Sequence, residues 1–465
     1  MRPALLLLPA LLLGGCAGFS PDGGFGVVET TVRERTGQSA QWVRSEDEAN
    51  SVRTRVKELL AQPLTAERAV QVALLNNPGL QAAYAEMGIA EADLVQASRW
   101  SGPKFSFARL RRGDELEYER SVFIDILGLV TIPLATKAQE KRFDAAKSRA
   151  AAEAMRLALD ARRGYFTAIA AQEAVRYMEQ VKSAAEASAE LGRRMAAAGN
   201  WSKLNQQREQ AFYAETTAQL ARVKQARVAS RERLSRLLGL WGDDLGFVLP
   251  DRLPDLPKAA REPGDLEAQA LVQRLDVQAA RRDTEALAES LGLSKVSRFV
   301  NLLELGAIHN TESPKPAQRG WEVELRIPIF DFGGARVARA EHVYQQSVNR
   351  LADTAIRARS EVRESYAAYR TAFDLARHYR DEVVPLRKRI SEEMLLRYNG
   401  MLSSVFELLA DARDSVGSVN AYIEALRDFW LAESDLQAAL TAGSPGATAP
   451  GARATAMPAS PAQGH

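Results

Sequence analysis

The segment ALLNNPGLQAA, Ala73–Ala83, recurs about 200 residues later as ALVQRLDVQAA, Ala270–Ala280. Two further pairs of matching segments follow in the same order and at nearly the same offset. They are TIPLATKAQEKRFDAA (131–146) with RIPIFDFGGARVARAE (326–341), and AAGNWSKL (197–204) with YNGMLSSV (398–405). Weak matches that keep one order and one offset predict a tandem duplication of a single structural unit.

Each copy reads as the same series of a helix, a strand region, a long helix, a turn and a last helix. The first copy is expected to have a helix over 64–100, strands within 102–133, a long helix over 134–198, a turn at Gly199 and a helix that ends near Leu240. The second is expected to have a helix to about Ser294, strands within 296–328, a long helix to about Asn399, a turn at Gly400 and a helix to about Ala442. A helix of about 65 residues would be roughly 95 Å long, too long for a globular core. The many alanines in the expected long helices favour close packing of these helices in antiparallel pairs.

The strand regions alternate apolar and polar residues with the two-residue period of a strand. In WEVELRIPIF, Trp321–Phe330, the apolar face holds Trp321, Val323, Leu325 and Ile327, and the polar face holds Glu322, Glu324 and Arg326. In the first copy, the expected apolar face is Val122, Ile124, Ile126, Val130 and Ile132, with Gly128 in register. Each region is long enough for two strands of the roughly 9–11 residues that cross a membrane. A soluble sheet with one solvated face would alternate in the same way.

The N-terminus favours the membrane interpretation. Arg2 precedes an apolar run at Ala4–Leu13, and small residues follow before Cys16, as is typical of a secretory signal. Leu13-Gly14-Gly15-Cys16 resembles the bacterial lipobox, which implies a covalent lipid on Cys16. Ala17, in place of an inner-membrane retention signal, implies an outer-membrane destination. Because Cys16 is the only cysteine, an intrachain disulfide is excluded.

The expected domain boundaries follow from the duplication and from composition. The segment LPDRLPDLPKAAREPGD (249–265), with four prolines, separates the copies. An Ala-, Pro- and Gly-rich end cannot bury enough apolar surface to order itself. The expected parts are a lipoprotein signal peptide (1–15), a lipidated extended leader (16–60), the first repeat (61–250), the Pro-rich linker (251–262), the second repeat (263–442) and a disordered tail (443–465).

Composition and motifs argue against other classes of function. Charged residues make up 26% of the chain and leave a net charge of only +2, so no basic footprint for nucleic acid is expected. The four histidines are scattered without metal-ligand spacing, and no nucleotide-binding or hydrolase motif occurs. We therefore expect no enzyme, no metal and no cofactor other than the lipid on Cys16.

Several segments together resemble the outer-membrane factors of the TolC family. They are LTAERAVQVALLNNPGLQAA (64–83), IPIFDFGGARVARAEHVY (327–344), RYNGMLSSVFELLADAR (397–413) and GNWSKL (199–204). The resemblance implies a mainly α fold with a membrane β part. Three chains would form a trimeric α-barrel of long antiparallel helices, and four strands per chain would contribute to a 12-stranded transmembrane β-barrel. It also implies the exit channel of a tripartite efflux or type I secretion system, in contact with outer-membrane lipid, a periplasmic adaptor and an inner-membrane transporter.

The resemblance also assigns candidate sites. The adaptor would dock at the two helix turns, formed by Gly199, Asn200, Trp201 and Ser202, and by Gly400, Met401, Leu402 and Ser403. Apolar turn residues suit a partner contact, but packing beneath the turn would explain them equally well. Glu407 and Asp411 lie four residues apart and are candidate acids of a periplasmic gate, or ordinary surface acids.

One alternative function remains, which is a lipid-anchored periplasmic coiled-coil adaptor or scaffold without a channel. It would explain the lipobox and the helices. It would predict one continuous β-rich domain, whereas here two strand pairs interrupt the helices at equivalent places. The sequence does not identify the cargo.

Overall fold

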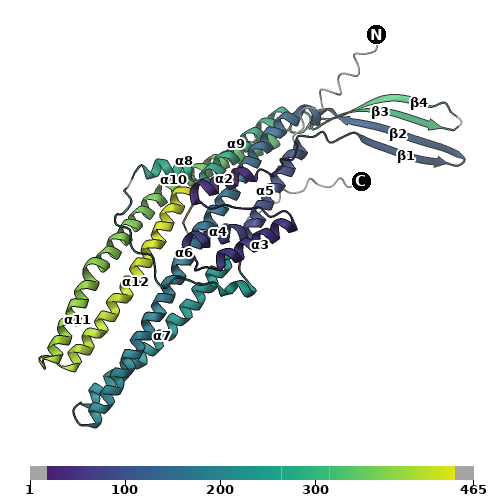
Figure 1. Cartoon of the computed structure of the whole chain (residues 1–465). Helices are drawn as coiled ribbons and strands as arrows, with labels where there is room; N and C mark the ends of the chain where they lie inside the picture. The colour runs from purple at the N-terminus through teal and green to yellow at the C-terminus, as the bar shows by residue number, and fades with distance from the viewer. Residues whose placement is uncertain (1–17, 263, 314, 446–465) are drawn as a thin grey trace. The chain divides into compact units, whose positions relative to one another are not determined.

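The computed structural model describes residues 18–262, 264–313 and 315–445 (Figure 1). The predicted signal peptide (1–15), Cys16 and most of the predicted tail (443–465) lie outside the described residues. The chain forms two compact units, each built from three segments. The first holds residues 18–31, 79–152 and 275–356, and the second holds residues 32–78, 153–274 and 357–445.

The first unit contains a four-stranded antiparallel sheet that is built from the two repeats. Its strands are β1 (Lys104–Arg112), β2 (Glu115–Asp125), β3 (Leu302–Glu312) and β4 (Gln318–Arg326), in the order β1-β2-β3-β4 (Figure 1). Each repeat supplies one hairpin, and the hairpins join where β2 pairs with β3. The expectation of two strands per repeat is confirmed.

Helices of both repeats also pack in the first unit. They are α5 (Pro78–Ala97), α9 (Leu275–Val296) and the first parts of α6 (Ile126–Ala197) and α10 (Gly334–His378). Lys141 on α6 pairs with Glu285 on α9 at 3.1 Å, and Arg282 donates to the carbonyl of Asp144 at 3.0 Å. These contacts join residues more than 130 positions apart in sequence, so the repeats pack on one another.

The second unit contains two helical hairpins and shorter elements around them. One hairpin is the remainder of α6 with α7 (Lys203–Leu238), and the other is α11 (Val384–Asn399) with α12 (Val405–Thr441). The shorter elements are α3 (Glu46–Leu60), α4 (Ala66–Asn76), a 3₁₀ turn (Gly242–Gly246) and α8 (Leu266–Gln273). An aromatic core joins the repeats, with Phe166 of α6 stacked on Trp430 of α12 at 5.0 Å and Phe429 against Tyr369 at 5.6 Å.

The helix expected over 64–100 is instead two helices, α4 and α5, that meet at Asn77. The proline ring of Pro78 disfavours helical geometry at the residue before it, and Asn77 accordingly has φ −76° and ψ 118°. The second copy breaks at the equivalent position, Arg274, between α8 and α9. The break within the first helix is therefore part of the duplicated unit.

The breaking residues have equivalent roles in the two repeats. Asn77 Nδ2 donates to the carbonyl of Leu237 at 2.9 Å, near the end of α7, and Arg274 Nη1 donates to the carbonyl of Ala439 at 3.5 Å, near the end of α12. The last carbonyls of a helix have no partner within the helix. In each repeat, the break therefore supplies a donor to the end of the repeat's last helix.

The strand region expected within 102–133 was wrong in part. Ile126, Gly128, Val130 and Ile132 belong to the start of α6 rather than to a strand, because the Asp125 carboxylate accepts from Gly128 N at 2.8 Å, as an N-cap does.

The leader (16–60) is not extended throughout, since residues Phe25–Thr36 form α2 and residues Glu46–Leu60 form α3. Ser45 caps α3 by accepting from Glu48 N, and Val52 and Val56 are buried one helical turn apart. One apolar stripe on a polar segment was enough to form a helix, although the composition resembles that of a linker.

The long helix expected to reach Asn399 is interrupted by a π-helical turn at Tyr379–Val383. Val384 N donates to the carbonyl of Tyr379, five residues back. Pro385 follows directly and has no N–H with which to continue the ordinary ladder, so a local irregularity is expected here.

Gly239 is expected to be intolerant of a side chain. It ends α7 with φ +67°, and a Cβ there would lie 2.6 Å from the carbonyl oxygen of Asn76. Gly239→Ala should therefore lower the free energy of unfolding by about 1–3 kcal/mol, measured by urea unfolding of the detergent-solubilised protein. Gly246→Ala, which meets open space, is the control. Equal stability of the two variants would contradict this prediction.

Candidate functional site: hairpin tips and the two faces of the sheet

The tip of the α6/α7 hairpin is closed by local contacts. Gly199 turns the chain with φ +76°, and Ser202 caps α7 by accepting from Asn205 N at 3.3 Å. The Trp201 ring lies against Gly192 of α6, since a Cβ at Gly192 would come within 3.1 Å of it. Trp201 therefore packs beneath the turn, while Asn200 is exposed.

The tip of the α11/α12 hairpin presents apolar side chains to solvent instead. Met401 is 94% exposed and Leu402 is 80% exposed. Met401 also has φ +57°, a conformation that an L side chain adopts only at a cost. Leu396, one turn back on α11, is exposed as well. The predicted tip residues thus separate into a packed group and an exposed apolar group.

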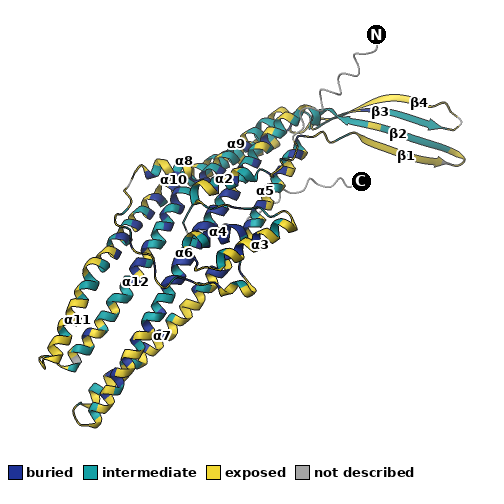
Figure 2. Cartoon of the chain, viewed as in Figure 1, coloured by how far each residue is buried: buried dark blue, intermediate teal, exposed yellow. Residues whose placement is uncertain are grey.

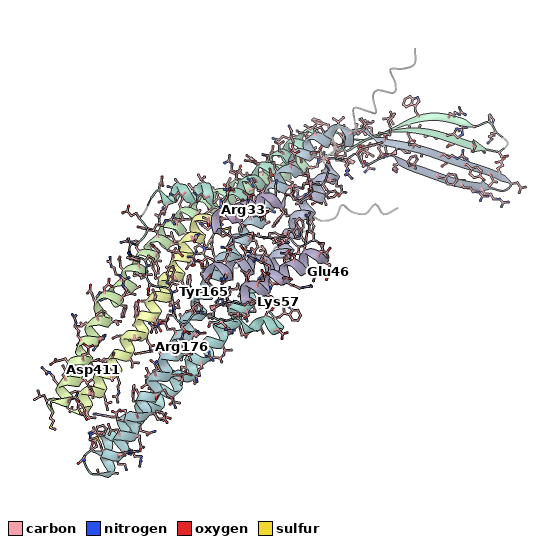
Figure 3. All side chains as sticks on the ribbon, viewed as in Figure 1. Arg33, Glu46, Lys57, Tyr165, Arg176 and Asp411 are labelled. Atoms are coloured by element: carbon pink, nitrogen blue, oxygen red, sulfur yellow. The ribbon has the colours of Figure 1, made fainter. Side chains whose placement is uncertain are left out.

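The two candidate gate acids both have local partners. Glu407 completes a capping box with Ser404, whose backbone N–H donates to the Glu407 carboxylate at 2.8 Å and lowers the pKa of that carboxyl. Asp411, labelled in Figure 3, is buried and accepts from Ser391 Oγ at 2.6 Å across the hairpin. Their role in a gate stays a prediction.

A buried polar cluster near the tips was not found from the sequence. Glu209 of α7 is 1% exposed and accepts from Ser188 Oγ of α6 and from Arg413 Nη2 of α12, each at 2.6 Å. The Arg413 guanidinium also stacks on Phe212 at 4.4 Å. Since residues 209 and 413 come from different repeats, the cluster ties the two helical hairpins together. Their separation in sequence left no signal by which to pair them.

The strand register divides the sheet into two faces. Trp321, Val323 and Leu325 pair across to Ala307, Leu305 and Leu303, so these six share one face, which we call face A. Glu322 and Glu324 lie on the opposite face, face B, where Glu324 is in one row with Glu304 and Asp125. Arg326 is also on face B, whereas Ile327 lies just beyond the end of β4.

The part of face A around Val323 is apolar and open to solvent in the isolated chain. Phe105, Trp321, Val323 and Leu325 are all exposed, and Figure 2 shows β1 and β4 largely in the colour of exposed residues. Exposed apolar side chains gathered on one sheet face mark a surface that meets another apolar phase or a partner. Among the described residues, no helix is long and apolar enough to cross a membrane.

Comparison with known proteins rests on structure. No protein-family model and no curated protein matches the sequence. The fold is similar to a membrane protein from Pseudomonas aeruginosa (TM-score 0.70, 20% identity), with 81% of this chain and 93% of that chain covered.

Two outer membrane channels are also similar in structure to this chain. The Campylobacter jejuni CmeC channel matches with a TM-score of 0.67 and 16% identity, covering 82% of this chain and 87% of its own. The Neisseria gonorrhoeae MtrE channel in its open state matches with a TM-score of 0.67 and 17% identity, covering 82% of this chain and 90% of its own. The match covers both repeats, and the chain therefore has the fold of these outer membrane channels.

Proposed function

We propose that the chain is one subunit of a passive, homotrimeric exit channel in the bacterial outer membrane. The observation that carries this proposal is the four-stranded sheet with one exposed apolar face, built from two hairpins at equivalent places in a helical duplication. A four-stranded sheet has two unpaired edges, which lipid cannot satisfy. Three chains would supply the 12 strands of a closed barrel, with face A toward lipid and face B toward a water-filled lumen.

The helical hairpins would extend the duct into the periplasm. Their tips would dock to a periplasmic adaptor that is bound in turn to an inner-membrane transporter, in an efflux or type I secretion system. A lipid on Cys16 would anchor each chain to the membrane, and Glu407 and Asp411 would lie near a gate. Transport through such a duct involves no covalent chemistry, so we propose no catalytic residues and no cofactor.

Conductance is the experiment that tests this proposal. Full-length protein extracted in detergent should cross-link as a trimer, and it should open ion-conducting pores when reconstituted in planar bilayers. The alternative function, a lipid-anchored coiled-coil scaffold, predicts extraction with detergent but no conductance. A monomer that leaves the membrane without detergent would contradict both.

The exposed tip provides a separate test of docking. Leu402→Asp should weaken binding of a periplasmic adaptor by about tenfold, because a charge would replace an exposed apolar side chain of the proposed interface. Surface-immobilised channel with adaptor in solution would measure the affinity.

The control is Trp241→Asp, which also changes an exposed apolar residue, outside the tips. Both variants should still form trimers. Unchanged affinity of the Leu402 variant would remove the α11/α12 tip from the proposed interface.

A further inference from the structure

The two faces of the sheet differ in charge as well as in hydrophobicity. All eight carboxylates of the described strand residues lie on face B. They are Glu115, Glu117, Glu119, Asp125, Glu304, Glu312, Glu322 and Glu324. Among described side chains, face A holds only basic charged residues, which are Arg109, Arg111, Arg120 and Arg319, together with His309.

The basic residues of face A are collected at one level of the sheet. Arg120, His309 and Arg319 occupy a single row across β2, β3 and β4. Arg109 is in the next row toward the hairpin loops, beside Tyr118. At about 3.4 Å per residue, the row lies roughly 20 Å along β4 from Leu325. Because the strands of such barrels tilt by about 35–45°, this is roughly 15 Å of height, more than half of the apolar band of about 25 Å that a barrel of this kind presents to lipid.

These arginines are held by an aromatic ring rather than by acids. The guanidinium groups of Arg109 and Arg120 lie 5.9 and 5.8 Å from the centre of the Tyr118 ring. Within the described residues, Arg120 and Arg319 have no carboxylate within ion-pair distance, and both are exposed. Stacking leaves the N–H groups of a guanidinium free to bind an anion, and its planar fork matches phosphate.

A hollow of about 510 Å³ lies directly beside this row. Its walls include Phe105, Phe107, Val122 and Ala307, with Arg120 and His309 on its polar side. All six side chains are on face A, where the small Ala307 lies in one row with Phe105 and Val122. An apolar hollow that ends at cations complements a molecule with a hydrocarbon part and an anionic head.

We propose that face A binds a phosphate-bearing lipid of the outer leaflet, with its phosphate on Arg120, Arg319 and His309 and an acyl chain in the hollow beside Ala307. The inference rests on the proposed function, which places face A in lipid. A neutral headgroup would leave the cations without a partner, and a free phosphate would leave the hollow empty. An uncompensated row of cations at this level would oppose insertion, and an anionic headgroup removes that cost.

Lipid binding by the full-length, detergent-solubilised protein tests the proposal, with lipid A as the probe and phosphatidylcholine as the reference lipid. Native mass spectrometry should show a clear preference for lipid A. Arg120→Gln and Arg319→Gln should each weaken that binding by about fivefold, and the double variant by roughly the product. Arg120→Lys should retain part of it. The control Lys104→Gln removes one positive charge from face B of the same sheet and should change nothing.

Two results would overturn the lipid site. They are equal affinity for both lipids, and an equal loss of lipid A binding in the Lys104 variant. Flotation with phosphatidylcholine vesicles separates this failure from that of the proposed function. A protein that inserts without preferring lipid A contradicts only the lipid site, whereas a protein that does not insert contradicts the channel.

Discussion

Val323→Arg is expected to abolish insertion of the protein into the outer membrane. Val323 lies in the apolar part of face A, in one row with Leu305 and Ile124. An arginine near the middle of the lipid-facing surface of a barrel costs about 2–4 kcal/mol. A trimer carries three copies, so the cost is roughly 6–12 kcal/mol per channel, which is comparable to the whole stability of a folded domain. Fractionation of the cell envelope, followed by cross-linking, measures the inserted trimer.

Ser121→Arg is the matched control, because it adds the same residue to the other face of the same sheet. On face B the new cation would meet water and the carboxylates gathered there, and insertion should persist. If the Val323 variant still inserts and conducts, face A does not meet lipid. If both variants fail to insert, the sheet tolerates an added arginine on neither face. A difference between the two faces would then not explain the loss of insertion.

The strands were predictable because two different environments impose a two-residue period on the sequence. In β4 that period was sufficient to assign Trp321, Val323 and Leu325 to one face. The same reasoning failed at Ile126–Ile132, where β-branched residues continue the pattern but Asp125 caps a helix. A single carboxylate at the right position outweighs strand propensity, since a capped helix satisfies its first amides locally.

The helix break at Arg274 and the buried polar cluster around Glu209 are features that local sequence patterns do not reveal. A continuous helix was expected over 64–100 although Pro78 lies within it, and no proline marks the equivalent break at Arg274. The partners of Glu209 lie 21 residues before it and 204 after it. Such pairs are set by which helices become neighbours, so they follow from the fold rather than from local periodicity. The tips were located correctly, but the distinction between a packed Trp201 and an exposed Leu402 required the structure.

Glu361→Leu is expected to cause the largest loss of stability in the second unit. The Arg274 side chain is 1% exposed, and its Nη1 donates to Glu361 Oε2 at 2.7 Å. Glu361 Oε1 accepts in addition from Ser444 Oγ at 2.7 Å. Removal of the carboxylate takes one counter-charge away from a buried guanidinium, and the loss of one partner of a buried ion pair costs about 3–5 kcal/mol. Urea unfolding followed by the helical circular dichroism signal measures the change.

The double variant Arg274→Met with Glu361→Leu should recover much of this loss, since an apolar pair of similar volume often replaces a buried ion pair without net cost. Recovery should remain incomplete, because Arg274 also donates to the carbonyl of Ala439 at the end of α12. Glu267→Leu is the control, since it removes a half-buried carboxylate whose partners between the same helices, Arg359 and Arg363, are exposed. Solvent screens that pair, so its loss should matter far less.

Equal losses for Glu361 and Glu267 would show that burial of Arg274 does not determine the strength of its ion pair. A double variant as unstable as Glu361→Leu would instead assign the cost to the contact between Arg274 and α12, and thus to the break that the two repeats share.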